Sequence, residues 1–73
     1  MKFFEVLMYV FSDDAVSVHL ETVKYFTNMT AAYEYAAERS RRIDTYSDVV
    51  KEIDKYGSFN GFPYVIKMHE FEA

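Results

Sequence analysis

The sequence predicts an α+β fold, in which a three-stranded antiparallel or mixed sheet of order 2-1-3 is packed with one long and one short helix. Three observations support this prediction. An apolar run opens the chain, a segment of alternating apolar and polar residues follows it, and two segments with helical spacing precede a last strand-like run. The element order is β-β-α-(α)-β, and a chain of 73 residues is expected to form a single compact domain over residues 1–73.

The first strand is predicted over Phe3–Phe11, where Glu5 is the only polar residue. Its aromatic and β-branched content favours a strand, and a strand that is apolar on both faces is usually central in its sheet. The run is shorter than the about 20 residues that cross a bilayer. Because Glu5 interrupts it and no small-residue cleavage site follows, we expect no signal peptide, no membrane partner and a cytoplasmic location.

A second strand is predicted from Val16 to about Phe26, because its apolar residues alternate with polar ones. The link before it has a turn composition, so the two strands are expected to form an antiparallel hairpin. Its expected register places Phe11 opposite Val16 and Glu5 opposite Thr22. A shift of one residue would instead place Glu5 opposite Glu21, where like charges destabilise the pair.

This register assigns the odd-numbered side of the first strand to the core. The even-numbered side then requires a cover, either the second helix or a partner chain. The expected core face is Phe3, Leu7, Tyr9, Phe11, Val16, Val18 and Leu20, and the other face carries Phe4, Val6, Met8 and Val10.

Helices are predicted over residues 31–44 and 48–56, where apolar residues recur at intervals of three and four. Asn28 and Thr30 are candidate N-caps of the first helix, Ser47 is the candidate N-cap of the second, and Gly57 is placed to end it. A single bent helix is the alternative.

The last strand is predicted over Tyr64–Phe71, after a loop of residues 58–62 with a turn at Asn60-Gly61. Pro63 suits the first position of that strand. The helical crossover should bring it beside the first strand, antiparallel to the first strand and parallel to the second.

The net charge of −4 argues against nucleic acid as a partner, since a nucleic-acid binder needs a positive field. The absence of cysteine excludes disulfides and cysteine metal sites. A core this small, held by seven Tyr and seven Phe, favours self-association.

No catalytic residue, metal ligand or cofactor is expected. His19 and His69 are the two histidines, and the predicted topology places them on the outer strands with the central strand between them. Neither a nucleophile elbow nor a phosphate-binding glycine loop is present. We therefore expect a protein that is not an enzyme.

The expected partner is another protein, either a host protein or a second copy of this chain. Apolar and aromatic side chains on the second sheet face and an acidic surface would make the contact, and a basic, nucleic-acid-handling target would suit that acidity. The candidate residues are Phe4, Val6, Met8, Val10, His19, His69 and Phe71, with Asp44, Asp48, Glu52 and Asp54.

The alternative is a dimeric nucleic-acid-binding or regulatory module that uses Arg39, Arg41 and Arg42. These arginines also lie in the last turns of the predicted first helix, where positive charge complements the helix dipole.

The N-terminal hairpin, the helix with Ala32, Tyr35 and Ala36, and the closing strand together resemble many small proteins of bacteriophages and mobile elements. This resemblance implies a compact accessory protein that binds and blocks or redirects a host protein, as anti-defence inhibitors such as anti-CRISPR proteins do. It assigns no functional residue.

Overall fold

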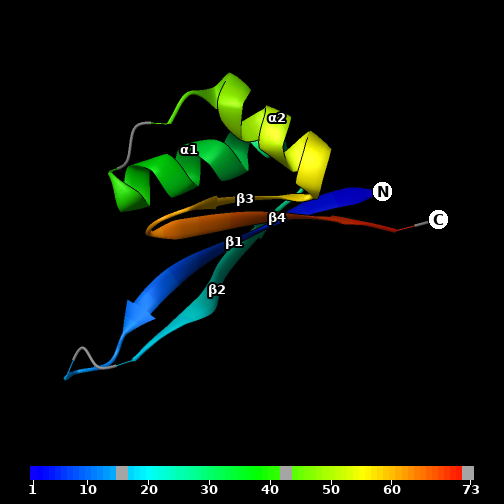
Figure 1. Cartoon of the computed structure of the whole chain (residues 1–73). Helices are drawn as coiled ribbons and strands as arrows, with labels where there is room; N and C mark the ends of the chain where they lie inside the picture. Colours follow the sequence, from blue (N-terminus) through cyan, green and yellow to red (C-terminus); the bar gives the residue numbers. More distant parts are fainter. Residues whose placement is uncertain (15–16, 42–43, 72–73) are drawn as a thin grey trace.

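Six elements follow one another in a computed structural model of the chain, which describes residues 1–14, 17–41 and 44–71. The strands are Lys2–Phe11 (β1), Val18–Phe26 (β2), Ser58–Gly61 (β3) and Tyr64–Glu70 (β4), and the helices are Met29–Ser40 (α1) and Tyr46–Tyr56 (α2). The strands form one antiparallel sheet of order β2-β1-β4-β3, and both helices lie on the same side of it (Figure 1).

The α+β class is confirmed, and so are the central position of β1 and the direction of β4 relative to β1 and β2. The prediction of three strands is wrong, because residues predicted as a loop form β3 at the edge of the sheet. Phe59 explains this difference: its ring is buried in the core, 5.6 Å from the ring of Tyr64. The chain turns at Phe62 and Pro63, joined by a cis peptide bond, and not at Asn60-Gly61.

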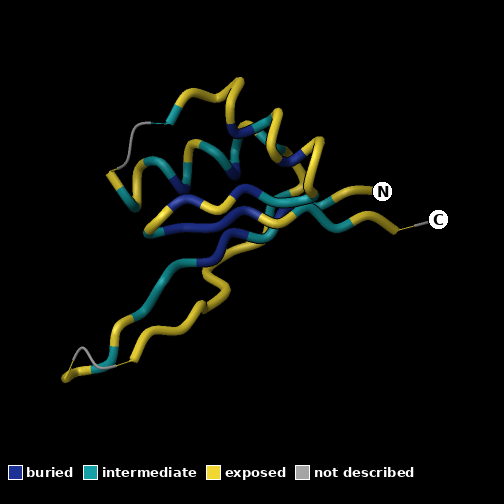
Figure 2. Tube along the Cα trace, in the orientation of Figure 1, coloured by how far each residue is buried: buried dark blue, intermediate teal, exposed yellow. Residues whose placement is uncertain are grey.

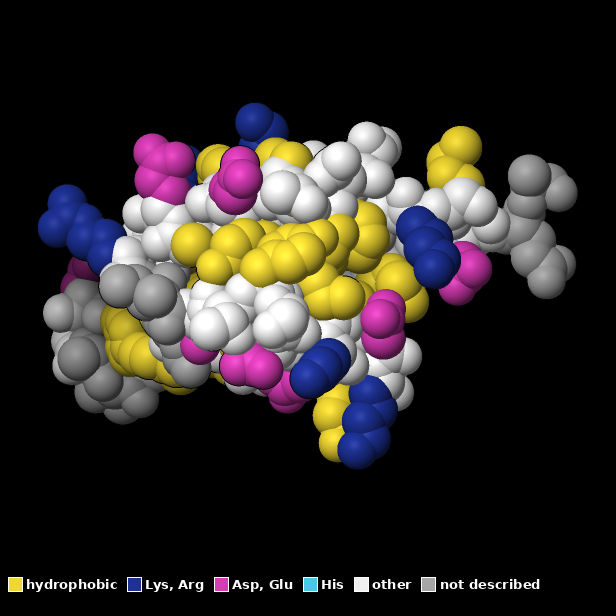
Figure 3. Space-filling model, turned by 90° about the horizontal axis from the view of Figure 1, so that it is seen from above, with side chains coloured by type: hydrophobic (Ala, Val, Ile, Leu, Met, Phe, Trp, Pro, Cys, Tyr) yellow, Lys and Arg dark blue, Asp and Glu magenta, His cyan; other side chains and the backbone are white. Residues whose placement is uncertain are grey.

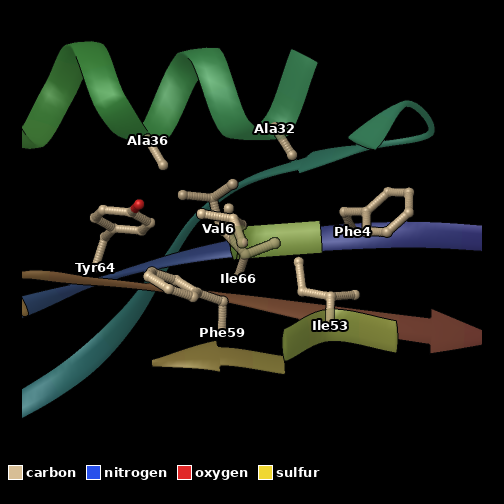
Figure 4. Packing of buried hydrophobic residues seen from close by; sticks show 9 residues of the cluster. Phe4, Val6, Ala32, Ala36, Ile53, Phe59, Tyr64 and Ile66 are labelled. Atoms are coloured by element: carbon tan, nitrogen blue, oxygen red, sulfur yellow. The ribbon is translucent and has the colours of Figure 1, made fainter. Parts of the chain in front are cut away.

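The core lies between the even-numbered side of β1 and the two helices (Figures 2 and 4). Phe4 and Val6 of β1 pack with the alanines of α1 and with the apolar face of α2. The expectation that the odd-numbered side forms the core is therefore wrong. Since β1 is apolar on both sides, its own pattern does not distinguish the faces, and the path of the helices decides which one is covered.

Small side chains bring α1 close to the sheet. Ala32 and Ala36 are fully buried, one turn apart on the same side of the helix. On α2, Val49 and Ile53 repeat this spacing with larger side chains. The protein is 19 Å along its shortest axis, which corresponds to one layer of helices on one layer of sheet.

The hairpin register differs from the expected one by two residues. Phe11 lies opposite Val18, and the expected partner Val16 lies outside the described residues. Ser12 explains the longer connection, since its hydroxyl donates to Asp14 at 2.6 Å and accepts from the Ser17 amide at 3.1 Å. A shift of two residues keeps the same side chains on the same face.

A β-bulge in β2 changes which side chains face the helices. Val6 pairs with Lys24 and Leu7 with Thr22, so Val23 is the extra residue. Beyond the bulge, Phe26 faces the helices, where its ring lies 5.2 Å from that of Tyr35. Tyr25, the residue before Phe26, then points to the opposite side of the sheet.

Two separate helices are present, which excludes the single bent helix. Asn28 caps α1 as predicted, since its side chain accepts from the Ala31 amide at 3.0 Å. The helix ends at Ser40 rather than at residue 44, because Arg41 adopts a left-handed conformation. Residues 42–43 lie outside the described residues.

The second helix begins two residues earlier than predicted, with Thr45 and not Ser47 as its N-cap, and Thr45 donates to Asp48 at 2.6 Å. Gly57 ends α2 as predicted, with φ +80° and its amide donating to the Ile53 carbonyl at 2.8 Å.

We predict that Ala36→Leu destabilises the protein by about 1–3 kcal/mol, because a larger side chain would force α1 away from the sheet. Ala37→Leu is the matched control, since Ala37 is partly exposed and lies outside the core cluster, and its effect should stay within about 0.5 kcal/mol. Urea unfolding measures both. Equal losses of unfolding free energy in the two variants would contradict a specific requirement for a small residue at position 36.

Gly57→Ala should cost about 1–2 kcal/mol, because alanine disfavours the left-handed conformation at this helix end. An added Cβ would meet no atom within 4 Å, so the cost is conformational and not steric crowding. Asn tolerates this conformation, so Gly57→Asn should lose less stability in the same urea experiment. A loss for Asn as large as for Ala would contradict this explanation.

Candidate binding face of the sheet

The side of the sheet opposite the helices, which we call the open face, carries the odd-numbered residues of β1 and their neighbours on β2 and β4. The described part of the chain places no helix on it (Figure 1). Leu7 and Val65 are cross-strand partners at its centre, and both are buried although neither belongs to the core cluster under the helices. Aromatic residues lie at both of its ends.

The first aromatic group is built around Phe3. Its ring lies 4.7 Å from His69 and 5.1 Å from Phe71, stacked on both, and 5.5 Å from Tyr25. The β-bulge brings Tyr25 to this side of the sheet. Tyr25 and Phe71 are nevertheless 57% and 54% exposed, so these rings pack on one another without being withdrawn from solvent.

The second aromatic group lies where β1 passes the turn between β3 and β4. Phe62 lies 5.1 Å from Tyr9 and 5.9 Å from Phe11. Phe62 and Phe11 are 58% and 54% exposed. Exposed aromatic side chains that continue across one face of a monomer are typical of a protein interaction site.

A hydrogen-bonded carboxylate lies between the two aromatic groups. Glu5 accepts hydrogen bonds from the Thr22 hydroxyl and from His69 Nε2, the latter at 2.8 Å, and its side chain is only 12% exposed. The bond from Thr22 is the main reason why the pKa of Glu5 is lowered, and His69 and Lys67 act in the same direction against the effect of burial. Because an ionised carboxylate only accepts, the proton lies on Nε2 of His69.

This arrangement is not that of a hydrolytic triad. There a histidine lies between the hydroxyl and the carboxylate and takes the proton of the hydroxyl. Here the carboxylate lies between the other two groups, so Thr22 donates to Glu5 and not to the histidine. Across the residues that the structure describes, no pocket is found, and no three His, Cys, Asp or Glu side chains come together as metal ligands.

The predicted apolar contact residues lie on two sides of the sheet, with Phe71 on the open face and the other four on the helix side of β1. Phe4 and Val6 are buried under the helices, and Met8 and Val10 are partly buried on the same side of β1. The even-numbered side was left open to helix or partner, and the helices cover it at Phe4, Val6 and Met8.

The two histidines lie on opposite faces of the sheet. His19 pairs with Val10 at the exposed end of the hairpin, 2.9 Å from Glu21. His69 pairs with Phe3. Among the predicted apolar and histidine contact residues, His69 and Phe71 are the ones that contact Phe3 on the open face.

The predicted acidic surface divides into two parts. Asp44 has a structural role, since its carboxylate accepts from the Tyr64 hydroxyl at 3.0 Å and its carbonyl accepts from Tyr33. The other three carboxylates, Asp48, Glu52 and Asp54, lie exposed on α2. Seen from the helix side, acidic and basic side chains border a hydrophobic band (Figure 3).

The arginines of the alternative site do not form one group in the described residues. Arg39 donates to the Tyr35 hydroxyl and lies 5.2 Å from the centre of its ring, and Lys24 lies 5.6 Å from the same ring. Arg41 is exposed at the end of α1, and Arg42 lies outside the described residues.

The sequence prediction missed Phe3, Tyr9 and Phe11 as surface residues because it assigned them to the core, and it missed Tyr25 because the β-bulge that brings it to this face was not predicted. It also missed the bond between Glu5 and His69, which depends on the pairing of β1 with β4. Its expectation that Glu5 meets Thr22 identified a real contact, since the two side chains are hydrogen-bonded although they are not paired across the strands.

The fold and this face define a small two-layer α+β protein with an uncovered aromatic sheet surface. No protein-family model, no curated protein and no solved structure gave a significant match to the chain. Within residues 1–14, 17–41 and 44–71, neither helix is long and apolar enough to span a membrane.

We predict that Glu5→Gln lowers stability at neutral pH and that this loss disappears in acid. The folded-state pKa of Glu5 is lowered, so the ionised carboxylate stabilises the fold above 4.5, its ordinary value, and this contribution is lost as the pH falls through the folded-state pKa. Urea unfolding from neutral to acidic pH measures the difference. The control is Glu38→Gln on the exposed side of α1, expected to change stability by less than about 0.5 kcal/mol. A difference for Glu5→Gln that does not depend on pH would contradict this account.

Proposed function

We propose that this protein is a non-enzymatic protein–protein interaction module, which acts as an inhibitor by occupying the surface of a host protein. We assign the contact with the host protein to the outer surface of α2, and the single observation that carries the interaction role is the open face with its two exposed aromatic groups. A surface of this composition is stabilised when another protein chain covers it, because burial removes aromatic area from water and aromatic residues dominate interface energies.

The outer surface of α2 supports the choice of a host target. Glu52 and Asp54 are exposed on this helix, close in sequence to Tyr56, which is 66% exposed. Lys55 lies 5.1 Å from the ring of Tyr56, but the acidic residues of α2 outnumber its lysines, so its outer surface complements a basic surface such as that of a nucleic-acid-handling protein. The overall charge of −4 would also speed the encounter with a basic target.

A second candidate function is a nucleic-acid-binding or regulatory module that works as a dimer. The observation that favours it is that Lys24 of β2 and Arg39 of α1 both lie near the ring of Tyr35. Two cations beside an aromatic ring can hold a phosphate and a stacked base. The small number of such cations and the net negative charge make this the weaker proposal.

For the leading proposal, we predict that Glu52→Gln/Asp54→Asn weakens capture of the host protein roughly threefold to tenfold, since removing charges at the edge of an interface slows association. The measurement is capture from a bacterial lysate with mass spectrometry, followed by titration of the purified target. Glu34→Gln/Glu38→Gln removes the same number of charges from α1 and should leave capture unchanged. Equal losses would show that only net charge matters, and capture of no protein at all would reject the leading proposal.

The second candidate is tested by titrating fluorescent oligonucleotides at physiological ionic strength. It requires binding that weakens as salt is added and that Lys24→Gln reduces. Binding of this kind would replace the leading proposal, whereas no binding would remove the second candidate.

A further inference from the structure

We infer that the open face binds the open face of a second copy of this chain, so that two sheets pack face to face with their helices outward. This inference rests on the proposed function, since it names the chain that covers the aromatic face. In such a dimer each sheet is covered on both sides, and the acidic surface of α2 on each copy remains free for a host protein. Three observations favour a second copy over other occupants.

The first observation is the charge of the face. Among the described residues of the strands, Glu5 and Lys67 are the oppositely charged side chains on this side, together with His69. Their charges nearly cancel, although the whole chain carries −4. Two copies can therefore meet here with little net repulsion, whereas a strongly basic or acidic partner, including nucleic acid, would find no net complementary charge.

The second observation is that the buried polar groups at the centre of the face are already paired within the chain. Glu5 is bonded to Thr22 and His69, and every buried side-chain nitrogen or oxygen among the described residues has a hydrogen-bond partner. Burial of these groups therefore requires no complementary donors or acceptors from the partner. Lys67 pairs with Ser58 of the short edge strand β3, so its flexible chain can carry the ammonium to water at the edge.

The third observation is the size of the face. At about 3.3 Å per residue and about 4.8 Å between strands, the four strands project roughly 450–500 Å², since β4 and β3 are shorter than β1. The accessible area of projecting aromatic rings exceeds this projection. It approaches the about 800 Å² that each partner contributes to a stable interface.

The exposed edge of β2 offers two copies another way to associate, but the structure disfavours it. The bulge at Val23 interrupts the regular pairing that a second strand would need, and Lys24 lies directly beside the bulge. Bulges and lysines are the features by which natural edge strands resist pairing with another chain. The face of the sheet is thus the better site for self-association.

Sedimentation equilibrium over a wide concentration range tests the inference with two variants of the face. Tyr25→Lys and Phe11→Lys place a cation in each of the two aromatic groups, at positions that are 57% and 54% exposed. Tyr56→Lys is the matched control, because Tyr56 is 66% exposed on the other side of the molecule. Circular dichroism and urea unfolding check that each variant folds. If one face variant does not fold, the other still tests the inference.

The wild type and Tyr56→Lys should reach twice the monomer mass of 8.6 kDa. Each face variant should weaken the dimer about tenfold or more, the effect expected for an aromatic residue within an interface. A wild type that stays monomeric would overturn the inference, and so would a dimer that neither face variant weakens.

The outcome for the proposed function is separate, because host capture is tested on α2. A monomeric wild type that still captures a host protein through α2 would leave the proposed function standing and remove only the dimer. A dimer that captures no host protein would leave the dimer inference standing and reject the proposed function.

Discussion

The packing of both helices on one side of the sheet, α1 over β1 and β4 and α2 over β3 and β4, is the constraint on which the rest of the structure depends. Ala32 and Ala36 allow α1 to approach the sheet, and Val49 and Ile53 place α2 beside it. With both helices in one layer, no helix among the described residues remains for the other side of the sheet. The open face is therefore a direct consequence of how the core is built, and its aromatic residues must either pack on one another or be covered by another chain.

The β-bulge at Val23 links the core to the open face. It directs Phe26 toward the helices and Tyr25 toward Phe3, so one extra residue supplies an aromatic ring to each side of the sheet. On the open face, Glu5 accepts hydrogen bonds from Thr22 on one neighbouring strand and from His69 on the other. These bonds stabilise an ionised carboxylate in a mostly apolar surface, and they leave that surface with few polar groups for a partner to satisfy.

Much of the fold could be predicted from local patterns. The strand character of β2, the cap at Asn28 and the glycine at position 57 are short-range signals and were predicted correctly, but the alternation in β2 was taken to place Val18 and Leu20 in the core, and both are exposed. The errors concern features that the local apolar and polar pattern does not specify. Ser58–Gly61 becomes a strand only because β4 is there to pair with it, and Arg41 ends α1 before the periodic pattern stops. The candidate site was predicted less well, because most of its residues were assigned to the core.

The sequence by itself determined a small α+β protein whose first strand is central and apolar on both sides, with net negative charge and without cysteine. The tertiary structure decided which side of that strand the helices cover. The physical reason is that a strand carries side chains to both faces with the same period, so a two-sided apolar pattern contains no information about which face is buried. Phe3 and Phe4 are neighbours of the same residue type, and the path of the helices places Phe4 in the core and Phe3 on the open face.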